Sequence, residues 1–543
     1  MYMASDSRPN FLILTTDQHN PNVMGYAGHP VVQTPNIDAL AANGTVFSRA
    51  YVAHPLCTPS RATLFTGLTT RGHRVRMNGI QLGYDVPTMP EALRQSGYRT
   101  HYDGKPHIRI SLTPQGMPLD EVDPFEFPEA QEMWATGRNK RIPTPYYGLE
   151  EVNFVNGHGH GSWGEYVNWL NREHPNEAHL FHNAVPEVPP SPAANFYSMS
   201  YKWALPFELH PMTWTTDHTV DFLNDYGRDA RIEAEYDASS ATPPGRTGHR
   251  GDRDPTRPFF LWSSLADPHV PLAPTAPYSH KYDPDDVPPP NRREGELDDL
   301  PPHIKDIYET PKKGRDIDPY RNEAAAHYYG LIEMIDDNFG KVLKALRDNG
   351  LEENTVIILT SDHGEALGDH SMWGKGPYHY DGVVRVPFIV SWPGHFKAGA
   401  THDGVISLVD FAPTILDIAG VPIPEGRKPP EMVGSSEPPP WPGRSLVPIL
   451  TGKEKGTSGM ALVEDDQDAL GFRIRTLATE RYRLTAYSGQ TYGELFDLQE
   501  DPAEVHNLWD DPDSKGIRDE LRIAMLDKIM STEYALPRRM GSA

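Results

Sequence analysis

The chain has 543 residues, 38% of them hydrophobic, and 75 acidic against 50 basic side chains give it a formal charge of −25. This length and apolar content permit a large core, and the acidic balance argues against a nucleic-acid partner, because such binding requires a basic surface. The sequence has no run of about 18 apolar residues and no basic segment before its first apolar run, which predicts a soluble, cytoplasmic protein with no membrane partner.

The N-terminal part alternates between short apolar runs and helix-start patterns. The run Asn10–Thr16 is bounded by polar residues and is typical of a buried parallel strand. A Thr-Pro pair at the start and a Gly past the end predict helices over 34–44 and 58–67, and a similar pattern predicts a helix over 88–97. A succession of this kind is typical of α/β domains.

Strands and helices continue to alternate further along the chain. The predicted elements are strands over 258–265, 354–360 and 385–392 and helices over 323–348 and 408–419. We therefore predict an α/β fold in which helices sandwich a large, mainly parallel sheet, and we assign this catalytic domain to residues 1–425.

Two Pro-rich stretches without clear periodicity, near 111–215 and 236–305, interrupt this domain. Long insertions of this kind are usually functional lids or ordered excursions. We expect them to shape the rim of a pocket and to contribute subunit contacts in a homo-oligomer. The His- and Gly-rich string 157–161 has no carboxylate or Cys at ligand spacing, so we predict a flexible surface loop there rather than a metal site.

The C-terminal part has a different pattern. Short strand-like runs such as Arg481–Tyr487 lie between residues 460 and 508, beyond a Pro-rich stretch. They predict a small C-terminal α+β subdomain, which we assign to residues 426–543.

Cys57 is the one cysteine of the chain, so no intramolecular disulfide can form. A single cysteine is usually a small buried hydrophobe, but here Thr58 and Pro59 predict a helix start directly after it. The partial positive charge and free N–H groups of a helix N-terminus suit an anionic nucleophile and an anionic substrate. Arg61, one turn into that helix, is placed to reach back to the same point.

Polar side chains also follow two of the predicted strands. Asp17 follows the first strand, and Asp362-His363 follow the strand over 354–360. In an open parallel sheet, ligands collect beyond the carboxyl ends of the strands. Two carboxylates and an imidazole at this edge predict a divalent metal site, and oxygen-rich ligation favours Ca²⁺ or Mn²⁺.

The motif Cys57-Thr58-Pro59-Ser60-Arg61, continued to Gly67, resembles the signature of type I sulfatases in the alkaline phosphatase superfamily. The resemblance implies an alkaline phosphatase-like fold. It also implies that a formylglycine-generating enzyme converts Cys57 to Cα-formylglycine, and that residue 57 joins Asp17, Asp362 and His363 at the metal.

Further segments fit the same family. Gly104-Lys105-Pro106-His107 resembles the Gly-Lys-x-His segment of sulfatases, which implies that Lys105 and His107 face the anion and the formylglycine. His269, in Asp267-Pro268-His269, and Lys375 match further substrate-binding and catalytic positions. We add Asn78 as a candidate substrate contact.

Two departures from many sulfatases keep the preferred substrate open. Asp17 is followed by Gln18 instead of a second aspartate, and Asp362 is followed by His363 instead of asparagine. Both features are similar to choline sulfatases and phosphonate monoester hydrolases, whereas the Lys105/His107 pair favours sulfate esters. We predict an arylsulfatase-like enzyme, with a phosphonate monoester hydrolase or phosphodiesterase as the alternative and a catalytically silent binding protein as a third hypothesis.

The resemblance implies a mechanism for the predicted sulfatase. One hydroxyl of hydrated formylglycine, held on the metal, attacks sulfur, and His269 and Lys375 supply the proton that the leaving alcohol needs. His107 then acts as the base that collapses the sulfated hemiacetal. Sulfate esters are inert enough that acid catalysis alone cannot suffice, so Arg61, Lys105 and the metal must add preorganised positive charge.

Overall fold

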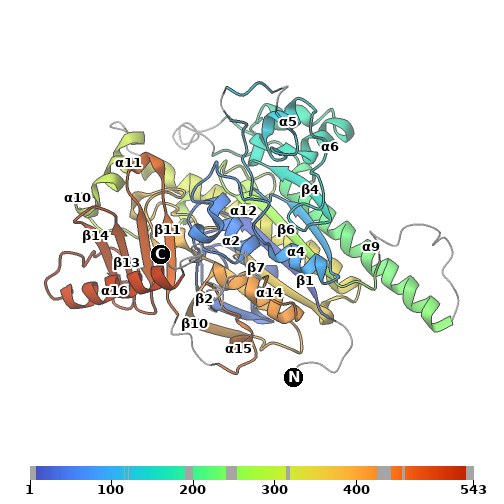
Figure 1. The fold of residues 1–543 in the computed structure, drawn as a ribbon. Helices are drawn as coiled ribbons and strands as arrows, with labels where there is room; N and C mark the ends of the chain where they lie inside the picture. Colours follow the sequence, from blue (N-terminus) through green and yellow to red (C-terminus); the bar gives the residue numbers. More distant parts are fainter. Residues whose placement is uncertain are drawn as a thin grey trace.

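A ten-stranded sheet lies at the centre of the computed structural model (Figure 1), which describes residues 8–532 apart from seven stretches. Those stretches are 115, 120–121, 190–199, 240–253, 313–317, 425–441 and 455–458. The strands lie side by side in the order β10 (Ala400–Ser407), β2 (Thr45–Tyr51), β9 (Phe388–Ser391), β7 (Thr355–Ser361), β1 (Asn10–Asp17), β6 (Phe259–Pro268), β3 (Arg99–Gly104), β4 (Glu151–Asn156) and β5 (Trp163–Gly164), with β8 (Arg385–Val386) paired to β2.

The prediction of a mainly parallel sheet is confirmed. The neighbours β7, β1, β6, β3 and β4 run parallel to one another, as do β10 and β2, whereas β9 is antiparallel to both β7 and β2. The strand predicted over 385–392 is divided into β8 and β9 at Pro387. A proline lacks the N–H donor that a continuous ladder needs, and this explains the break.

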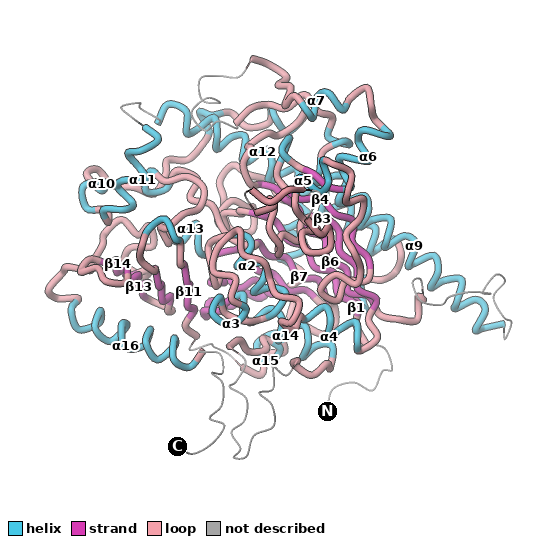
Figure 2. Tube along the Cα trace, turned by 45° about the horizontal axis from the view of Figure 1, so that its top comes forward, coloured by secondary structure: helices cyan, strands magenta, loops and turns pink. Residues whose placement is uncertain are grey.

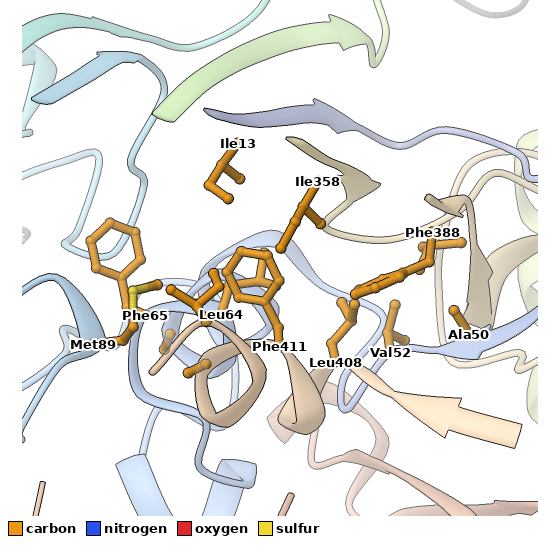
Figure 3. Close-up of a cluster of buried hydrophobic side chains, with 14 of the residues drawn as sticks. Ile13, Ala50, Val52, Leu64, Phe65, Met89, Ile358, Phe388, Leu408 and Phe411 are labelled. Carbon is orange, nitrogen blue, oxygen red and sulfur yellow. The ribbon is translucent and has the colours of Figure 1, made fainter. Parts of the chain in front are cut away.

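Alternating apolar side chains of the central strands pack against helices on both faces of the sheet. Phe11 and Ile13 of β1 join one hydrophobic cluster, and Leu12 and Leu14 join the other, as the two-residue period of a strand requires. The first cluster, shown in Figure 3, is covered by α2 (Cys57–Thr66), α4 (Met89–Gln95) and α14 (Phe411–Ala419). The second is covered by α1 (Pro35–Ala42), α9 (Pro211–Ser239) and α12 (Asp318–Asp348).

The helices predicted from capping patterns are present, but one boundary differs. The sequence places Cys57 outside the helix, with Thr58 as its cap, whereas α2 begins at Cys57 and follows Leu56 in an extended conformation. The Thr58 N–H donates to Asn78 Oδ1 at 3.0 Å. A side chain from another loop therefore caps the helix, instead of Thr58 as predicted. Among the described residues no helix is both long and apolar enough to cross a bilayer.

The two Pro-rich insertions contain more regular structure than predicted. The first contributes β4 and β5 to the sheet: residues 151–154 of β4 pair in parallel with β3, and its last two residues pair with β5 in antiparallel orientation. Its helices and those of the rest of the chain are α3 (Thr70–His73), α5 (Gln131–Ala135), α6 (Glu165–Glu173), α7 (Ala178–His182), α10 (Glu296–Asp299), α11 (Pro302–Lys312), α13 (Asp381–Val384) and α15 (Val447–Leu450). Most of these elements are short, so their periodicity is hard to recognise.

A four-stranded antiparallel sheet forms the C-terminal α+β unit. It comprises β11 (Ala461–Asp465), β12 (Ile474–Ala478), β13 (Tyr482–Tyr487) and β14 (Gly493–Asp497), and α16 (Lys515–Ser531) lies along it (Figure 2). Leu484 and Leu495 pack with α16, while Val463 and Phe496 belong to the cluster of the main sheet. The boundary between 1–425 and 426–543 lies outside the described residues, and the division into two domains stays a prediction.

Candidate active site

Polar side chains gather at the carboxyl ends of four neighbouring parallel strands. β1 ends at Asp17, β7 is followed by Asp362 and His363, β3 is followed by Lys105, and β6 ends next to His269. Because parallel strands end at one edge of a sheet, residues far apart in the sequence meet there. The helix start at Cys57 faces the same edge, as the contacts of its sulfur atom show.

The four predicted metal ligands form one cluster. Asp17, Cys57, Asp362 and His363 offer ligand atoms that all lie within 4.8 Å of one another. His363 Nε2 lies 3.4 Å from Asp17 Oδ1 and 3.7 Å from Asp362 Oδ1. Its Nδ1 lies 3.0 Å from the Gly364 carbonyl oxygen, so Nδ1 carries the proton and Nε2 offers a lone pair. Two carboxylates and this lone pair fit a hard divalent cation such as Ca²⁺ or Mn²⁺.

Arg61 holds the two carboxylates in place. Its Nε donates to Asp362 Oδ2 at 2.8 Å and its Nη2 to Asp17 Oδ2 at 3.1 Å. Nη1 donates to the Lys105 carbonyl oxygen and to Ser264 Oγ. The side chain is 2% exposed, so its guanidinium is enclosed by the protein. The planar fork of a guanidinium suits this bridging of two buried acids.

Cys57 lies in surroundings that lower the pKa of its thiol. Its Sγ lies 3.0 Å from Lys375 Nζ and 3.2 Å from His363 Nε2, and the residue is 2% exposed. Burial and the Asp17 carboxylate would by themselves raise the pKa of the thiol, but the ammonium groups of Lys375 and Lys105 lower it well below its usual value. The structure thus brings residue 57 to the predicted metal cluster.

Lys375 occupies the centre of this arrangement. Its ammonium group contacts Cys57 Sγ, His363 Nε2 at 2.9 Å and Gln18 Oε1 at 3.1 Å. Burial alone would lower the pKa of Lys375, but the anions at Cys57 and Asp17 raise it. The Nε2 lone pair can serve one partner at a time, so a cation bound by His363 takes the place of the Lys375 hydrogen bond. Gln18, where many sulfatases have a second aspartate, then remains a partner for Lys375.

Lys105 and His107 lie beside the cluster on the segment after β3. Lys105 is fully buried and donates to Asp17 Oδ2. His107 Nε2 contacts Ser111 Oγ at 3.0 Å and Thr58 Oγ1 at 3.4 Å, whereas its Nδ1 is buried without a partner among the described residues. Burial lowers the pKa of His107, so its imidazole is neutral and able to accept a proton.

His269 and the acid two residues before it complete this side of the site. Burial and the Lys375 ammonium lower the pKa of His269 to about 4, and its Nδ1 lies 2.7 Å from the Val270 carbonyl oxygen. Asp267 is 3% exposed, and burial together with the Asp17 carboxylate raises its pKa to about 7. Asp267 belongs to the motif Asp267-Pro268-His269, but no role for it is predicted from the sequence.

His158 also lies at the site, although no role for it is predicted from the sequence. The string 157–161 is predicted as a flexible surface loop, and for His158 that prediction is wrong. His158 Nε2 lies 2.5 Å from Lys105 Nζ, and the ring of His158 stacks on the ring of His269. Asp17, His158 and His269 also offer ligand atoms within 4.8 Å of one another. No carboxylate or Cys lies at ligand spacing within the string itself. The partners of His158 come from three other segments of the chain, which only the fold brings close to it.

Asn78 lies at the helix start. Its Oδ1 accepts the Thr58 N–H hydrogen bond described above, and the residue is exposed. In the structure it therefore positions the turn that begins with Cys57. A direct contact between Asn78 and a substrate stays a prediction.

Comparison with known proteins agrees with this geometry. The family model described as Sulfatase matches residues 9–421. The chain belongs to the sulfatase family. A second model, described as N-sulphoglucosamine sulphohydrolase, C-terminal, matches residues 368–531. This sulfatase is a hydrolase that acts on sulfate esters, with the fold of the alkaline phosphatase superfamily.

Relatives with known names and structures are distant. The arylsulfatase of Clostridium perfringens is 26% identical over 539 residues, which cover 97% of this chain and 95% of the relative. The uncharacterized sulfatase YidJ of Escherichia coli is 27% identical over 524 residues, which cover 96% of this chain and 87% of the relative. The crystal structure of the phosphonate monoester hydrolase of Agrobacterium radiobacter superposes with a TM-score of 0.75 at 23% identity, covers 98% of this chain and 100% of that chain, and shares the fold.

Proposed function

We propose that this sulfatase hydrolyses sulfate monoesters in the manner of an arylsulfatase, with Cys57 matured to Cα-formylglycine. The observation that supports this proposal most directly is the position of Cys57. It begins a helix, and its sulfur lies among Asp17, His363 and Lys375. A nucleophile at this position meets both an anion-binding helix end and a cluster suited to a divalent cation.

The cation would be held by Asp17, Asp362 and His363 together with residue 57, and it would supply positive charge next to the reacting sulfate. An aldehyde hydrate at position 57 would offer two hydroxyls. One would attack sulfur while the S–O bond to the leaving alcohol breaks, and loss of the proton from the other would break the C–O bond to sulfate and restore the aldehyde. Maturation of Cys57 by a formylglycine-generating enzyme is part of the proposal.

The remaining side chains stabilise the charge that develops during sulfate transfer. Lys105 and Lys375 bring two ammonium groups to the site, and Arg61 keeps the two carboxylates in register. Loss of one preorganised donor of this kind typically reduces turnover by about 10²–10³-fold. This contribution is of the same order as the roughly 10²–10⁴-fold that one general acid provides, and the site has two such ammonium groups, so the pair of lysines is central to the proposal.

Proton transfer falls to the lysine and histidine side chains around residue 57. Lys375 carries a proton that it can share with the leaving alcohol oxygen. The Nδ1 atom of His269 faces the Val270 carbonyl oxygen, so Nε2 is the ring nitrogen of His269 that would serve the same oxygen. His107 Nδ1, buried and without a partner among the described residues, is suited to take the proton from residue 57 when sulfate is released.

Parallel assays of an aryl sulfate and an aryl phosphonate monoester test the proposal. The protein is produced together with a formylglycine-generating enzyme, and peptide mass spectrometry reads the state of residue 57. We expect the aldehyde at position 57 and a higher kcat/KM on the sulfate ester, with Cys57→Ala as the inactive control. An unmodified thiol under these conditions would instead support a silent binding protein.

A phosphonate monoester hydrolase or phosphodiesterase is the second candidate. The observation in its favour is the Gln18 side chain, which binds Lys375 at the place where many sulfatases carry a second aspartate. A far higher kcat/KM on the phosphonate in the same assay would reverse the order of the two candidates.

A further inference from the structure

The loop that carries His158 is closely fitted to its surroundings. It connects β4 to β5, and two glycines flank His158 with positive φ, 79° at Gly157 and 48° at Gly159. A Cβ atom at Gly157 would lie 2.3 Å from the Gly161 carbonyl oxygen, and one at Gly159 would lie 2.3 Å from Cγ of Pro271. Pro271 is two residues beyond His269, so glycine is required here for the loops of the two insertions to meet.

The imidazole of His158 makes three contacts at this junction, and in one of them its Nε2 lies 3.8 Å from Asp17 Oδ2. Its ring lies parallel to the ring of His269, with the ring centres 3.5 Å apart and an angle of 8° between the planes. Its Nε2 accepts a hydrogen bond from Lys105 Nζ. One side chain therefore contacts two of the residues that the sequence assigns to the sulfate-binding site.

The hydrogen bond to Lys105 has a geometric consequence. An ammonium group has three N–H donors in a tetrahedral arrangement. For Lys105, Asp17 Oδ2 accepts one and His158 Nε2 accepts another, and these are its acceptors among the described residues. These two hydrogen bonds together with the Cε–Nζ bond fix the direction of the third N–H. With Asp17 alone, the side chain could pivot about the one remaining hydrogen bond and move that N–H with it.

We propose that His158 is a positioning residue for sulfate hydrolysis, which aims the third N–H of Lys105 at the substrate and holds the ring of His269 in its plane. The inference rests on the proposed function, because it assigns a role in the site described above. It differs from a space-filling role, since a phenylalanine fills the same volume and stacks equally well but accepts no hydrogen bond.

Substitutions of His158 separate the ring contact from the hydrogen bond. His158→Phe keeps an aromatic ring on His269 and removes the acceptor, and His158→Gln keeps an acceptor and removes the ring. For His158→Phe we expect kcat/KM on an aryl sulfate to fall about 10²-fold with a raised KM, as for the loss of one preorganised donor. His158→Gln should recover part of this loss. The control is His160→Phe in the same loop, whose Nδ1 contacts Tyr201 at 2.9 Å outside the site, and it should keep the wild-type kcat/KM.

A double-mutant cycle with Lys105→Met tests the route of the effect. If His158 acts through Lys105, adding His158→Phe to Lys105→Met should change kcat/KM by less than about twofold. If the losses in kcat/KM of the two single variants multiply in the double variant, the proposal is overturned. A His158→Phe variant with wild-type kcat/KM would overturn it as well.

A binding measurement keeps this inference separate from the proposed function. Calorimetric titration of the unmatured protein with inorganic sulfate, in buffer containing Mn²⁺, reports anion binding without catalysis. We expect His158→Phe to weaken sulfate binding about tenfold or more and His160→Phe to leave it unchanged. If the matured wild type hydrolyses no sulfate ester although the unmatured protein binds sulfate, the proposed function fails. The sulfate affinities of His158→Phe and His160→Phe then still decide whether His158 has the positioning role. Equal affinities in the wild type and His158→Phe would overturn the positioning role.

Discussion

Arg61 shows how one side chain can determine the geometry of a buried anionic site. Its guanidinium bridges Asp17 and Asp362, and all three side chains are 2% exposed or less. A buried ion pair contributes little net stability when it is intact, but removal of one partner leaves uncompensated charge and is costly. At this site the loss would fall mainly on Asp362, because Asp17 keeps its ion pair with Lys105.

We therefore predict that Arg61→Met lowers the free energy of unfolding by about 3–5 kcal/mol. Mn²⁺ should restore part of this loss, because a cation bound at the carboxylates offsets the same charge. Urea denaturation with and without Mn²⁺ measures both effects. The matched control is Arg228→Met, which removes an exposed ion pair with Asp225 on α9 and should change stability little. An Arg61→Met variant as stable as the control would contradict the assigned role.

The start of α2 is the element on which the position of residue 57 depends. Asn78 Oδ1 accepts the Thr58 N–H at that start, and no side chain of the helix itself caps it. For Asn78→Ala we predict a loss of about 0.5–2 kcal/mol, the usual effect of removing a helix N-cap. A modest fall in kcat/KM should accompany it, and thermal unfolding and aryl sulfate kinetics measure the two quantities. A large fall in kcat/KM with unchanged stability would instead support the predicted substrate contact.

The pairing of β3 with β4 includes a charged cluster that makes stability depend on pH. Burial alone would lower the pKa of His101, but Asp103 and Glu151 raise it to about 9. Because the folded-state pKa exceeds the unfolded value of about 6.5, this stabilisation is fully present below pH 6.5 and is lost as the pH rises through 9. His101→Gln should therefore flatten the fall in unfolding free energy between pH 6 and 9.5, by an amount on the order of 2–3 kcal/mol. Parallel stability curves for the wild type and the variant would rule out this linkage.

Elements with a strong local pattern are predictable from this sequence, and elements defined by distant partners are not. Asn10–Thr16 carries its strand pattern in seven consecutive residues and coincides with β1 apart from Asp17. The helix start at Cys57 was misplaced by one residue because its cap, Asn78, comes from another loop. His158 is not predictable for the same reason, because its partners Lys105 and His269 lie far from it in the sequence and meet it only in the fold. The cluster of Asp17, Asp362 and His363 was predictable, because each residue follows a strong local strand pattern.

At the scale of the whole molecule, the C-terminal sheet reaches the loop in front of Cys57. The Glu464 N–H donates to the Ala53 carbonyl oxygen at 2.9 Å, and Asp465 Oδ1 lies 3.5 Å from His54 Nε2. Side chains of β11 and β14 also belong to the core cluster of the main sheet. The C-terminal unit thus contributes to the same core that supports α2.

We predict that residues 1–424 produced alone do not fold into a stable protein, because truncation exposes this shared apolar surface to water. The full chain should unfold in one cooperative transition in calorimetry. A truncated chain that unfolds cooperatively, or two separate transitions in the full chain, would show that residues 1–425 form an independent domain.

Lys375 gives the site a consequence for how the enzyme is assembled in the cell. Its ammonium already neutralises the acidic cluster and engages the imidazole that a metal would use. If a divalent ion binds at Asp17, Asp362 and His363, we expect the polypeptide to fold before the ion arrives, because the Lys375 ammonium already offsets the charge of these carboxylates. Metal uptake would then be a late exchange reaction, in which a tethered cation gives up its place to a diffusible one.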